Sequence, residues 1–353
     1  MAVVSLLIII VCIYLLAIIT DEFFIVSLDQ ISQKLKLPND VAGASLMAMG
    51  SSAPELAIAL LALFRGSGEH SDLGIATIVG SAVFNILVIT GVSAIARPAR
   101  ITLPVIIRDS IMYGASIGLL LYTFADGTIT LFEAFIFLIF YFFYIVILFN
   151  WKSFYSEPPE ILDEVVAPIE EAHHEEVGGI QAVNHFIAKI IGYLMGDAKK
   201  SYVRAFVVSI LFIAVISWFL VEYAIVFSNA VGLPPVIVAL TILAGGTSIP
   251  DMIASIVVAK QGRGQMAVAN AVGSNIFDIL IGLGVPWIIA MTVLGKEIHV
   301  GTGDLWTSTI ILAATVILLL VFALTSRTLS RLEGWILLLA YVAYVIWAIL
   351  TGG

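Results

Sequence analysis

Ten apolar stretches, each close to the length that crosses a lipid bilayer, occupy most of this 353-residue chain. A spanning helix needs about 20 mainly apolar residues, and inside lipid every backbone polar group must be satisfied within the protein. The stretches lie at 2–20, 40–64, 73–96, 104–124 and 129–149, and then at 204–228, 235–259, 266–294, 305–325 and 333–350. We therefore expect an all-α integral membrane protein with ten transmembrane helices.

Composition excludes several classes of protein. Apolar residues make up 61% of the chain and charged residues only 12%, which is inconsistent with a soluble enzyme built on one core. Lys and Arg number 16 against 25 Asp and Glu, so the chain is too acidic for a nucleic-acid binder. Cys12 is the one cysteine, which excludes an intrachain disulfide or a cysteine-based metal cluster. Function must therefore depend on a few polar groups at membrane depth, with inorganic cations and the lipid bilayer as partners.

Basic residues predict how the chain sits in the membrane. Placing both termini outside leaves only Arg65 and Lys296 of the basic residues on the outer side. Cytoplasmic loops carry an excess of Lys and Arg, so this orientation agrees with the rule and the opposite one violates it. We expect a multi-pass protein of the cell (plasma) membrane, with the long central loop in the cytoplasm.

The central loop, residues 150–203, is the one long polar segment. Its run 157–176 is rich in Glu and contains prolines but no Lys or Arg, which is typical of a solvated linker. A regulatory cation-sensing segment is the alternative, although the acidic spacing does not match an EF-hand loop. Residues 180–194 then show helical apolar spacing beside lysines, which predicts an amphipathic helix on the inner membrane surface.

Two sequence blocks recur in the same order in the two halves. Residues 37–56 read LPNDVAGASLMAMGSSAPEL and residues 233–252 read LPPVIVALTILAGGTSIPDM. Further on, residues 80–92 read GSAVFNILVITGV and residues 273–285 read GSNIFDILIGLGV, with seven of thirteen positions identical. Two collinear matches are strong evidence of a duplicated unit.

Each half holds five predicted spans, and an odd number forces the second copy to enter the membrane from the opposite side. We therefore divide the chain into a first five-helix repeat at 1–149, the cytoplasmic loop at 150–203 and an inverted five-helix repeat at 204–353. Inverted repeats whose interrupted helices meet at the bilayer midplane are the architecture of secondary transporters.

Polar residues gather at matching places in the two copies. Pro54 removes a backbone donor and frees carbonyl groups about one turn earlier, and Pro250 does the same in the second copy. Helical spacing then places several polar residues on shared faces of the second, third, seventh and eighth spans. They are Ser51, Ser52 and Glu55, Ser81 and Asn85, Thr247, Ser248 and Asp251, and Ser274 and Asp278.

Convergence of these faces would bring together three carboxylates, one amide and several hydroxyls. Such oxygen donors suit hard cations such as Ca²⁺ and Na⁺, whereas copper or zinc would favour sulfur or imidazole. Three buried carboxylates without a basic partner need about three positive charges, which Ca²⁺ plus one monovalent ion or three Na⁺ would supply. The alternative is a structural role, in which individual Ser, Thr and Gly residues only allow close helix packing.

These motifs resemble those of the cation/calcium exchanger superfamily, and most of all those of the potassium-dependent sodium/calcium exchangers. The blocks that carry the resemblance are GSSAPE and GSAVFN in one half, and GTSIPD and GSNIFD in the other. The resemblance implies that Glu55 and Asp251 bind Ca²⁺ from opposite halves and that Asp278 stands at the position associated with potassium coupling. It also implies a set that completes the monovalent sites: Ser52, Ser81, Asn85, Ser248, Ser274 and Asp278, with the Ser51 and Thr247 hydroxyls and backbone carbonyls near Ala48 and Ala244.

The resulting hypothesis is a secondary active antiporter, not an enzyme, that exchanges Na⁺ for Ca²⁺ by alternating access at a midplane carboxylate site. Transport of K⁺ together with Ca²⁺ stays open, and no prosthetic group is expected. A proton-coupled Ca²⁺ antiporter is the alternative, because a carboxylate can bind H⁺ in place of Na⁺. We expect a monomer to be the transport unit.

Overall fold

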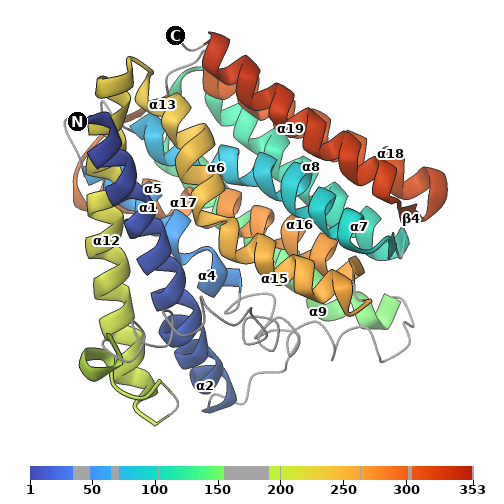
Figure 1. Cartoon of the computed structure of the whole chain (residues 1–353), viewed down its shortest axis with the longest axis horizontal. Coiled ribbons are helices and arrows are strands. Elements are labelled where there is room, and N and C mark those ends of the chain that lie inside the picture. Colours follow the sequence, from blue (N-terminus) through green and yellow to red (C-terminus); the bar gives the residue numbers. More distant parts are fainter. Residues whose placement is uncertain are drawn as a thin grey trace.

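The computed structural model describes residues 1–34, 48–64, 71–101, 103–154, 191–198, 200–262, 264–300 and 304–351. Within these ranges, seven helical segments are long and apolar enough to cross a membrane, and one bent pair of helices makes an eighth. Figure 1 shows them as one bundle, with the start of α1 and the end of α19 toward the same end of the molecule. The predicted acidic run and most of the predicted amphipathic helix lie outside the described residues.

Each of the ten predicted stretches contains helix where it is described, but two do not qualify as apolar spans. The second is represented by α4 (Ala48–Ser51) and α5 (Ala53–Phe64), because its predicted first residues lie outside the described ranges. The fourth is α8 (Leu103–Phe124), which is long enough but carries the Arg108–Asp109 ion pair. Charged residues lower the hydropathy of a segment, so α8 is less apolar than its neighbours.

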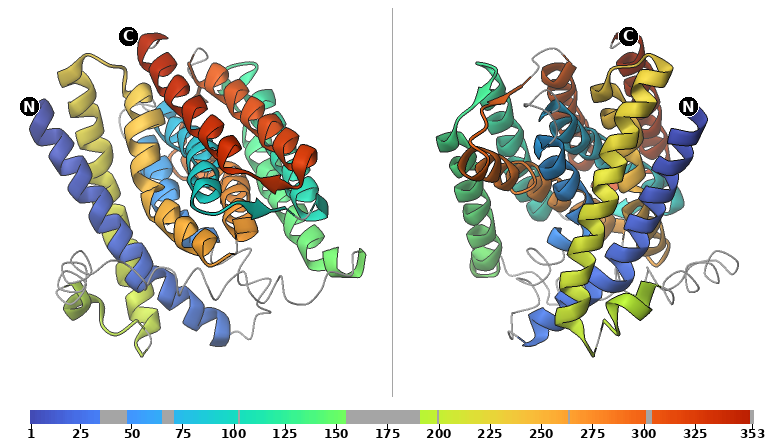
Figure 2. Two further views of the ribbon diagram at one scale, coloured as in Figure 1. Left: turned by 45° about the vertical axis from the view of Figure 1, so that its right-hand side comes forward. Right: turned by 90° about the vertical axis from the view of Figure 1, so that its left-hand side faces the viewer.

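A long helical arm flanks the bundle. α1 (Ala2–Ile19) continues through a π-helical turn, η1 (Thr20–Ile25), into α2 (Val26–Lys34), so this helix runs well past the predicted end at residue 20. α12 (Tyr202–Val231) packs along it, and the pair lies side by side in every view (Figure 2). The polar residues after position 20 predict that the helix ends there. In the structure the helix continues, and its continuation packs against α12.

Two interrupted helices from opposite halves form the centre of the bundle. α6 (Ser71–Phe84), η3 (Asn85–Ile89) and α7 (Thr90–Ala96) run as one almost wholly buried segment. Its counterpart consists of α16 (Gly264–Leu280) and α17 (Gly284–Val293), separated by a turn. Around them lie α8, α9 (Leu131–Phe154), α18 (Asp304–Ser326) and α19 (Arg331–Thr351).

Packing between the halves is reciprocal. α8 packs on α16 as α18 packs on α6, α9 packs on α17 as α19 packs on α7, and α5 packs on α17 as α15 (Ile249–Lys260) packs on α7. Aromatic contacts show the same reciprocity. Tyr141 of the first half lies edge-on to Phe277 of the second, and Tyr341 of the second half lies edge-on to Phe84 of the first. The duplicated sequence blocks are therefore matched by duplicated contacts.

Short strands join the loops of the two halves. β1 (Ala99–Arg100) pairs with β4 (Thr328–Leu329), and β2 (Thr128–Ile129) pairs with β3 (Ile298–His299), both antiparallel. Each strand pair places one loop from each half at the same end of the bundle. The two loops of each pair are ones that the basic residues assign to the same side of the membrane.

Matching capping boxes begin α9 and α19. Glu133 Oε2 accepts hydrogen bonds from the Thr130 backbone N–H and hydroxyl, both at 2.7 Å, and Glu333 Oε2 accepts the same pair from Ser330 at 2.6 and 2.7 Å. A capping box satisfies backbone donors that a helix start leaves without partners. The two helices thus start by the same device at corresponding places.

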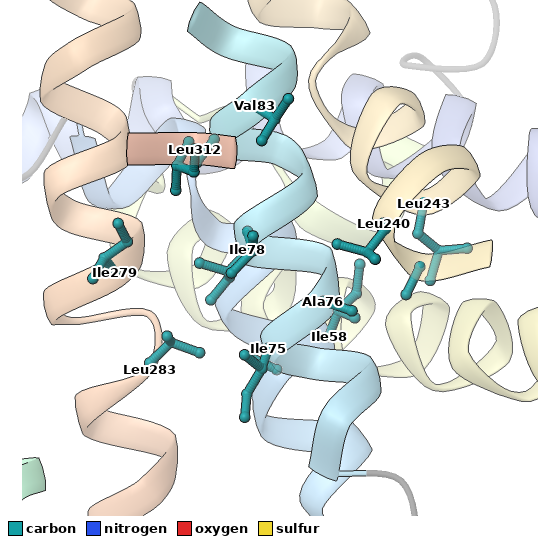
Figure 3. Close-up of a cluster of buried hydrophobic side chains, with 14 of the residues drawn as sticks. Ile58, Ile75, Ala76, Ile78, Val83, Leu240, Leu243, Ile279, Leu283 and Leu312 are labelled. Atoms are coloured by element: carbon teal, nitrogen blue, oxygen red, sulfur yellow. The ribbon is translucent and has the colours of Figure 1, made fainter. Parts of the chain in front are cut away.

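Aliphatic side chains fill the space between the central helices and their neighbours. Figure 3 shows Ile75 and Ile78 of α6 beside Leu240 and Leu243 of η4 (Ala239–Leu243) and Ile279 of α16. At the closest approach, a Cβ on Gly80 would meet the Leu240 carbonyl and would lie 2.8 Å from Ala244 Cβ. Gly80 therefore lets α6 touch the backbone of the opposite half.

Candidate cation site

Two helices break beside the duplicated Pro-acid motifs. α4 ends at Ser51 and α5 begins at Ala53, with Ser52 between them. In the second half, Ser248 separates α14 (Ala244–Thr247) from α15. The helix preceding Ser248 and α15 are bent by 44° relative to each other. Because Pro250 lies in the first turn of α15 it cannot donate to a carbonyl of the preceding turn, so the chain bends there. The predicted interruptions are confirmed.

The three predicted carboxylates lie near one another but do not form one compact cluster. Glu55 and Asp278 are 3% and 2% exposed, whereas Asp251 is partly exposed. The charge of Glu55 acts on both Asp251 and Asp278, and the charge of Asp251 also acts on Asp278. Among the described residues, no three Asp, Glu, His or Cys side chains are grouped closely enough to hold one metal ion by themselves.

Oxygen atoms from both halves are buried at this place without a hydrogen-bond partner. They are Glu55 Oε2, Asn85 Oδ1, Ser248 Oγ and Asp278 Oδ1. Burying an acceptor without a partner is costly, and burying a charge without compensation costs more. No basic residue is among the groups that act on Asp251 or Asp278, so the surrounding protein supplies no compensating cation in the described part of the chain.

Interhelical contacts link the two copies of the motif. The Glu55 carboxylate of the first half lies beside the Thr247 side chain of the second. In the reciprocal direction, the Asp278 carboxylate is hydrogen-bonded to Ser52 of the first half. Each carboxylate therefore lies beside a hydroxyl from the other copy of the repeat, a relation that the linear sequence does not reveal.

Two of the hydroxyl groups around the site, those of Thr247 and Ser81, donate their hydrogens to their own helices. Thr247 Oγ1 donates to the carbonyls of Leu243 and Ala244 at 3.1 and 3.3 Å, and Ser81 Oγ donates to Ile78 at 2.9 Å. A hydroxyl has one donor and two acceptor lone pairs, so donation to the backbone leaves the lone pairs available to a cation. The Ala244 carbonyl already accepts from Thr247 and from the Ser248 amide, the latter at 3.4 Å.

Asn275 is a site residue that the sequence analysis did not select. Its Nδ2 donates to the Ala82 carbonyl at 3.1 Å and to the Tyr113 hydroxyl at 2.9 Å, while its Oδ1 accepts from Asn85 Nδ2 at 2.8 Å. Asn275 and Tyr113 are wholly buried. The available signal was the amide in GSNIFD where the first copy, GSAVFN, has alanine.

For the other predicted site residues, the structure gives fewer contacts. Ser274 Oγ donates to the Asn270 carbonyl at 3.0 Å and lies 3.5 Å from Asn85 Nδ2, so it belongs to the same network. Ser81 is wholly buried one helical turn before Asn85. Ala48 is the first residue of α4, which places its backbone at the start of the interrupted segment.

A narrow cleft, part of it open to the outside, reaches the edge of this site. One wall is a face of α1 and η1, and the others come from the two helix breaks, including Ser51, Thr247 and Asp251. Asp251 is therefore the carboxylate nearest to an access route, whereas Glu55 and Asp278 lie deeper.

Buried oxygen atoms without partners, beside helix breaks in a bundle of membrane-spanning helices, are typical of a membrane transporter of hard cations. The sequence matches the family "Sodium/calcium exchanger protein" over residues 5–150 and 201–350. The chain belongs to this family of ion exchangers, and it is a multi-pass membrane transporter and not an enzyme.

Relatives and solved structures agree with this assignment. The chain is 27% identical to sodium/potassium/calcium exchanger 4 of Mus musculus, with 96% of the chain and 79% of the relative aligned. It is 28% identical to sodium/potassium/calcium exchanger 5 of Homo sapiens, over 93% of the chain and 79% of the relative.

Among solved structures, the sodium-calcium exchanger NCX_Mj in Na⁺ and Sr²⁺ matches with a TM-score of 0.58 and 20% identity, over 97% of this chain and 98% of that one. The H⁺/Ca²⁺ exchanger CAX matches with a TM-score of 0.71 and 16% identity, over 98% and 82% of the two chains. These likenesses show the exchanger fold.

Proposed function

We propose that this protein exchanges Na⁺ for Ca²⁺ by alternating access. The observation that carries the proposal is the set of buried oxygen atoms without partners, contributed by both halves, beside carboxylates that no basic residue balances. Because an uncompensated buried charge is costly, a site of this kind favours states in which cations occupy it. Two alternative cation loads of equal charge then give exchange.

The proposed scaffold has ten spans in two inverted five-helix repeats, 1–149 and 204–353, joined by the loop 150–203. Support comes from the reciprocal helix packing, the paired strands and the matching capping boxes. The family match also covers two separate segments and leaves out most of the loop. Movement of one repeat relative to the other would expose the site to each side in turn.

Ca²⁺ would be held between the halves by Glu55 and Asp251. Ca²⁺ takes six to eight oxygen ligands, so two carboxylates need further donors. The hydroxyls of Ser51 and Thr247 and the carbonyls near Ala48 and Ala244 are the proposed additional ligands. The helix breaks beside both motifs support this assignment, because they are where backbone oxygens can leave the helical hydrogen-bond pattern.

Na⁺ would be held by smaller sets of the same kind of ligand. The proposed residues are Ser52, Ser81, Asn85, Ser248, Ser274 and Asp278. In support, Asn85 Oδ1, Ser248 Oγ and Asp278 Oδ1 are buried and lack partners. Three Na⁺ would balance the same three negative charges as Ca²⁺ plus one monovalent cation, which makes the two loads interchangeable.

K⁺ is the proposed monovalent ion that accompanies Ca²⁺, with Asp278 as its principal charge partner. The relatives described above carry the name sodium/potassium/calcium exchanger. Asp278 is more deeply buried than Asp251 and has an oxygen without a partner, so it can hold an ion that a bound Ca²⁺ does not neutralise.

One chain supplies every proposed ligand, so we propose the monomer as the transport unit. We also propose that both termini lie outside the cell and that the protein resides in the plasma membrane. The strand pairs support the grouping of the loops by joining β1 to β4 at one end of the bundle and β2 to β3 at the other, and the distribution of basic residues supports which end is cytoplasmic.

Purified full-length protein in liposomes tests the proposal. Uptake of radiolabelled Ca²⁺ is measured while the gradients of Na⁺, K⁺ and H⁺ are set independently. We expect uptake that requires an outward Na⁺ gradient and is unaffected by a pH step without Na⁺. Uptake driven by the pH step alone would instead establish the proton-coupled alternative, and uptake without any counter-ion would overturn exchange.

A further inference from the structure

The cleft beside Asp251 has a wall that the ligand assignments above do not use. Five residues of the first helical arm line it at positions i, i+3, i+4, i+7 and i+8, which lie on one face of a helix: Ile13, Leu16, Ala17, Thr20 and Asp21. The face is apolar at its beginning and becomes polar at its last two positions. Those two positions lie in η1, where the helix widens into a π-helical turn.

Thr20 contributes an acceptor to the wall of this cleft. Its side chain is 4% exposed, and its hydroxyl oxygen is buried without a hydrogen-bond partner, although a threonine in a helix usually bonds to a carbonyl of the preceding turn. Thr90 and Thr309 make such bonds in the described part of the chain, to Asn85 and Leu305 at 3.2 and 2.7 Å. The Thr20 hydroxyl is therefore an acceptor in the wall of the cleft that the described part of the chain leaves unsatisfied.

Asp21 provides a charge next to this acceptor. It is partly exposed, it lines the cleft, and its charge acts on Asp251 across the cleft. None of the described residues that line the cleft is basic. Two carboxylates facing one wet cleft repel each other, and a divalent cation between them would remove that repulsion.

We propose that Thr20 and Asp21, with Ser51 and Asp251 across the cleft, form an additional loading site for a hydrated divalent cation on the way to the buried site. Water shared between the ion and these oxygens would fill much of its coordination shell, so the site binds weakly and releases the ion to Asp251. The inference rests on the proposed Ca²⁺ transport, and it assigns a function to the arm formed by α1 and η1.

The main test replaces Asp21 by Asn in the full-length protein. A loading site raises the local cation concentration, so its loss changes the concentration needed for half-maximal uptake more than the maximal rate. We expect the half-saturating Ca²⁺ concentration to rise roughly fivefold, as one unit charge acting on a divalent ion in a wet cleft implies. The maximal rate should stay within about twofold, and Asp21→Glu should restore wild-type behaviour.

Glu22→Gln is the matched control, because it removes the same charge from the next residue of η1. Glu22 is exposed and does not line the cleft, so its replacement should leave both kinetic constants unchanged. Thr20→Val keeps the shape of the side chain and should raise the half-saturating concentration by about twofold, the loss of one weak ligand. Equal constants for Asp21→Asn and wild type would overturn the proposal, as would a lower maximal rate at an unchanged half-saturating concentration.

Equilibrium binding separates failure of this inference from failure of the exchange proposal. Detergent-purified Glu55→Gln protein, which keeps both carboxylates of the loading site, should still bind radiolabelled Ca²⁺ weakly, and Asp21→Asn added to it should remove that binding. This readout needs no Na⁺-driven transport. Identical binding by the single and double variants, each confirmed as folded by size-exclusion chromatography, would overturn the loading site.

Discussion

Asn85 in the first half donates a 2.8 Å hydrogen bond from Nδ2 to Oδ1 of Asn275 in the second half. The bond joins the two central helices and fixes the direction of the Asn85 amide. Because Nδ2 is engaged in this way, Oδ1 of the same amide is the atom that remains buried without a partner. A contact between repeats thus orients an oxygen proposed to bind a cation.

Replacing Glu55 by Gln keeps its size and removes its charge. Loss of a charged ligand to a divalent ion costs about 3 kcal/mol or more, so Na⁺-dependent Ca²⁺ uptake should fall roughly a hundredfold. Asp251→Asn should behave in the same way. The control is Glu297→Gln, whose side chain is 89% exposed. Uptake by Glu55→Gln at the rate of this control would remove Glu55 from the site.

Asp278→Asn tests the proposed potassium ligand. The substitution leaves a neutral oxygen that can still accept, but it removes the charge that would attract a monovalent ion. Ca²⁺ uptake should lose its stimulation by K⁺ while Na⁺ dependence persists. The measurement is the K⁺ concentration series in liposomes at fixed Na⁺ and Ca²⁺, and an unchanged K⁺ response contradicts the assignment.

Asn275→Ala tests the amide network. Without Asn275, the Asn85 Nδ2 and the Ala82 carbonyl lose partners in a buried place, at a cost of about 1–3 kcal/mol for each group left unsatisfied. We expect a lower unfolding temperature and weaker Na⁺ activation. Tyr113→Phe is the milder variant, because it removes one acceptor of Asn275 and leaves the Asn85 contact intact. Equal Na⁺ activation in the two variants would show that Asn275 does not orient Asn85.

Gly80→Ala tests the close approach of the halves, and Gly273→Ala is its control at the corresponding position. A Cβ on Gly80 would meet the Leu240 backbone, whereas one on Gly273 would meet nothing within 4 Å. Overpacking costs about 1–3 kcal/mol, while Ala in a free helical position gains up to about 1 kcal/mol over Gly. Thermal unfolding in detergent should therefore separate the variants in opposite directions. Equal shifts would contradict the packing described for α6.

Cysteine labelling tests the orientation in the membrane. Arg100→Cys and His299→Cys, in a chain whose Cys12 has been replaced by Ala, place exposed thiols in β1 and β3, at opposite ends of the bundle. A membrane-impermeant thiol reagent added to intact cells should label position 299 and not position 100. Labelling of position 100 alone would reverse the proposed orientation.

The sequence alone determined the class of fold and the chemical character of the site. Apolar length predicts membrane helices because hydrocarbon excludes unpaired backbone groups, and repeated Pro-acid blocks predict helix breaks with oxygen donors. These inferences depend on local composition and on spacing within one helix. The family match confirms the resemblance found in the motifs.

Only the tertiary structure decided which side chains meet. The contacts of Glu55 with Thr247 and of Asp278 with Ser52 join residues from opposite halves, as does the amide pair of Asn85 and Asn275. The continuation of the first helix past residue 20, and with it the position of Asp21 in the cleft, also depends on packing against α12. Such relations follow from how helices pack in three dimensions, and the periodicity of one segment carries no information about the neighbour that it will contact.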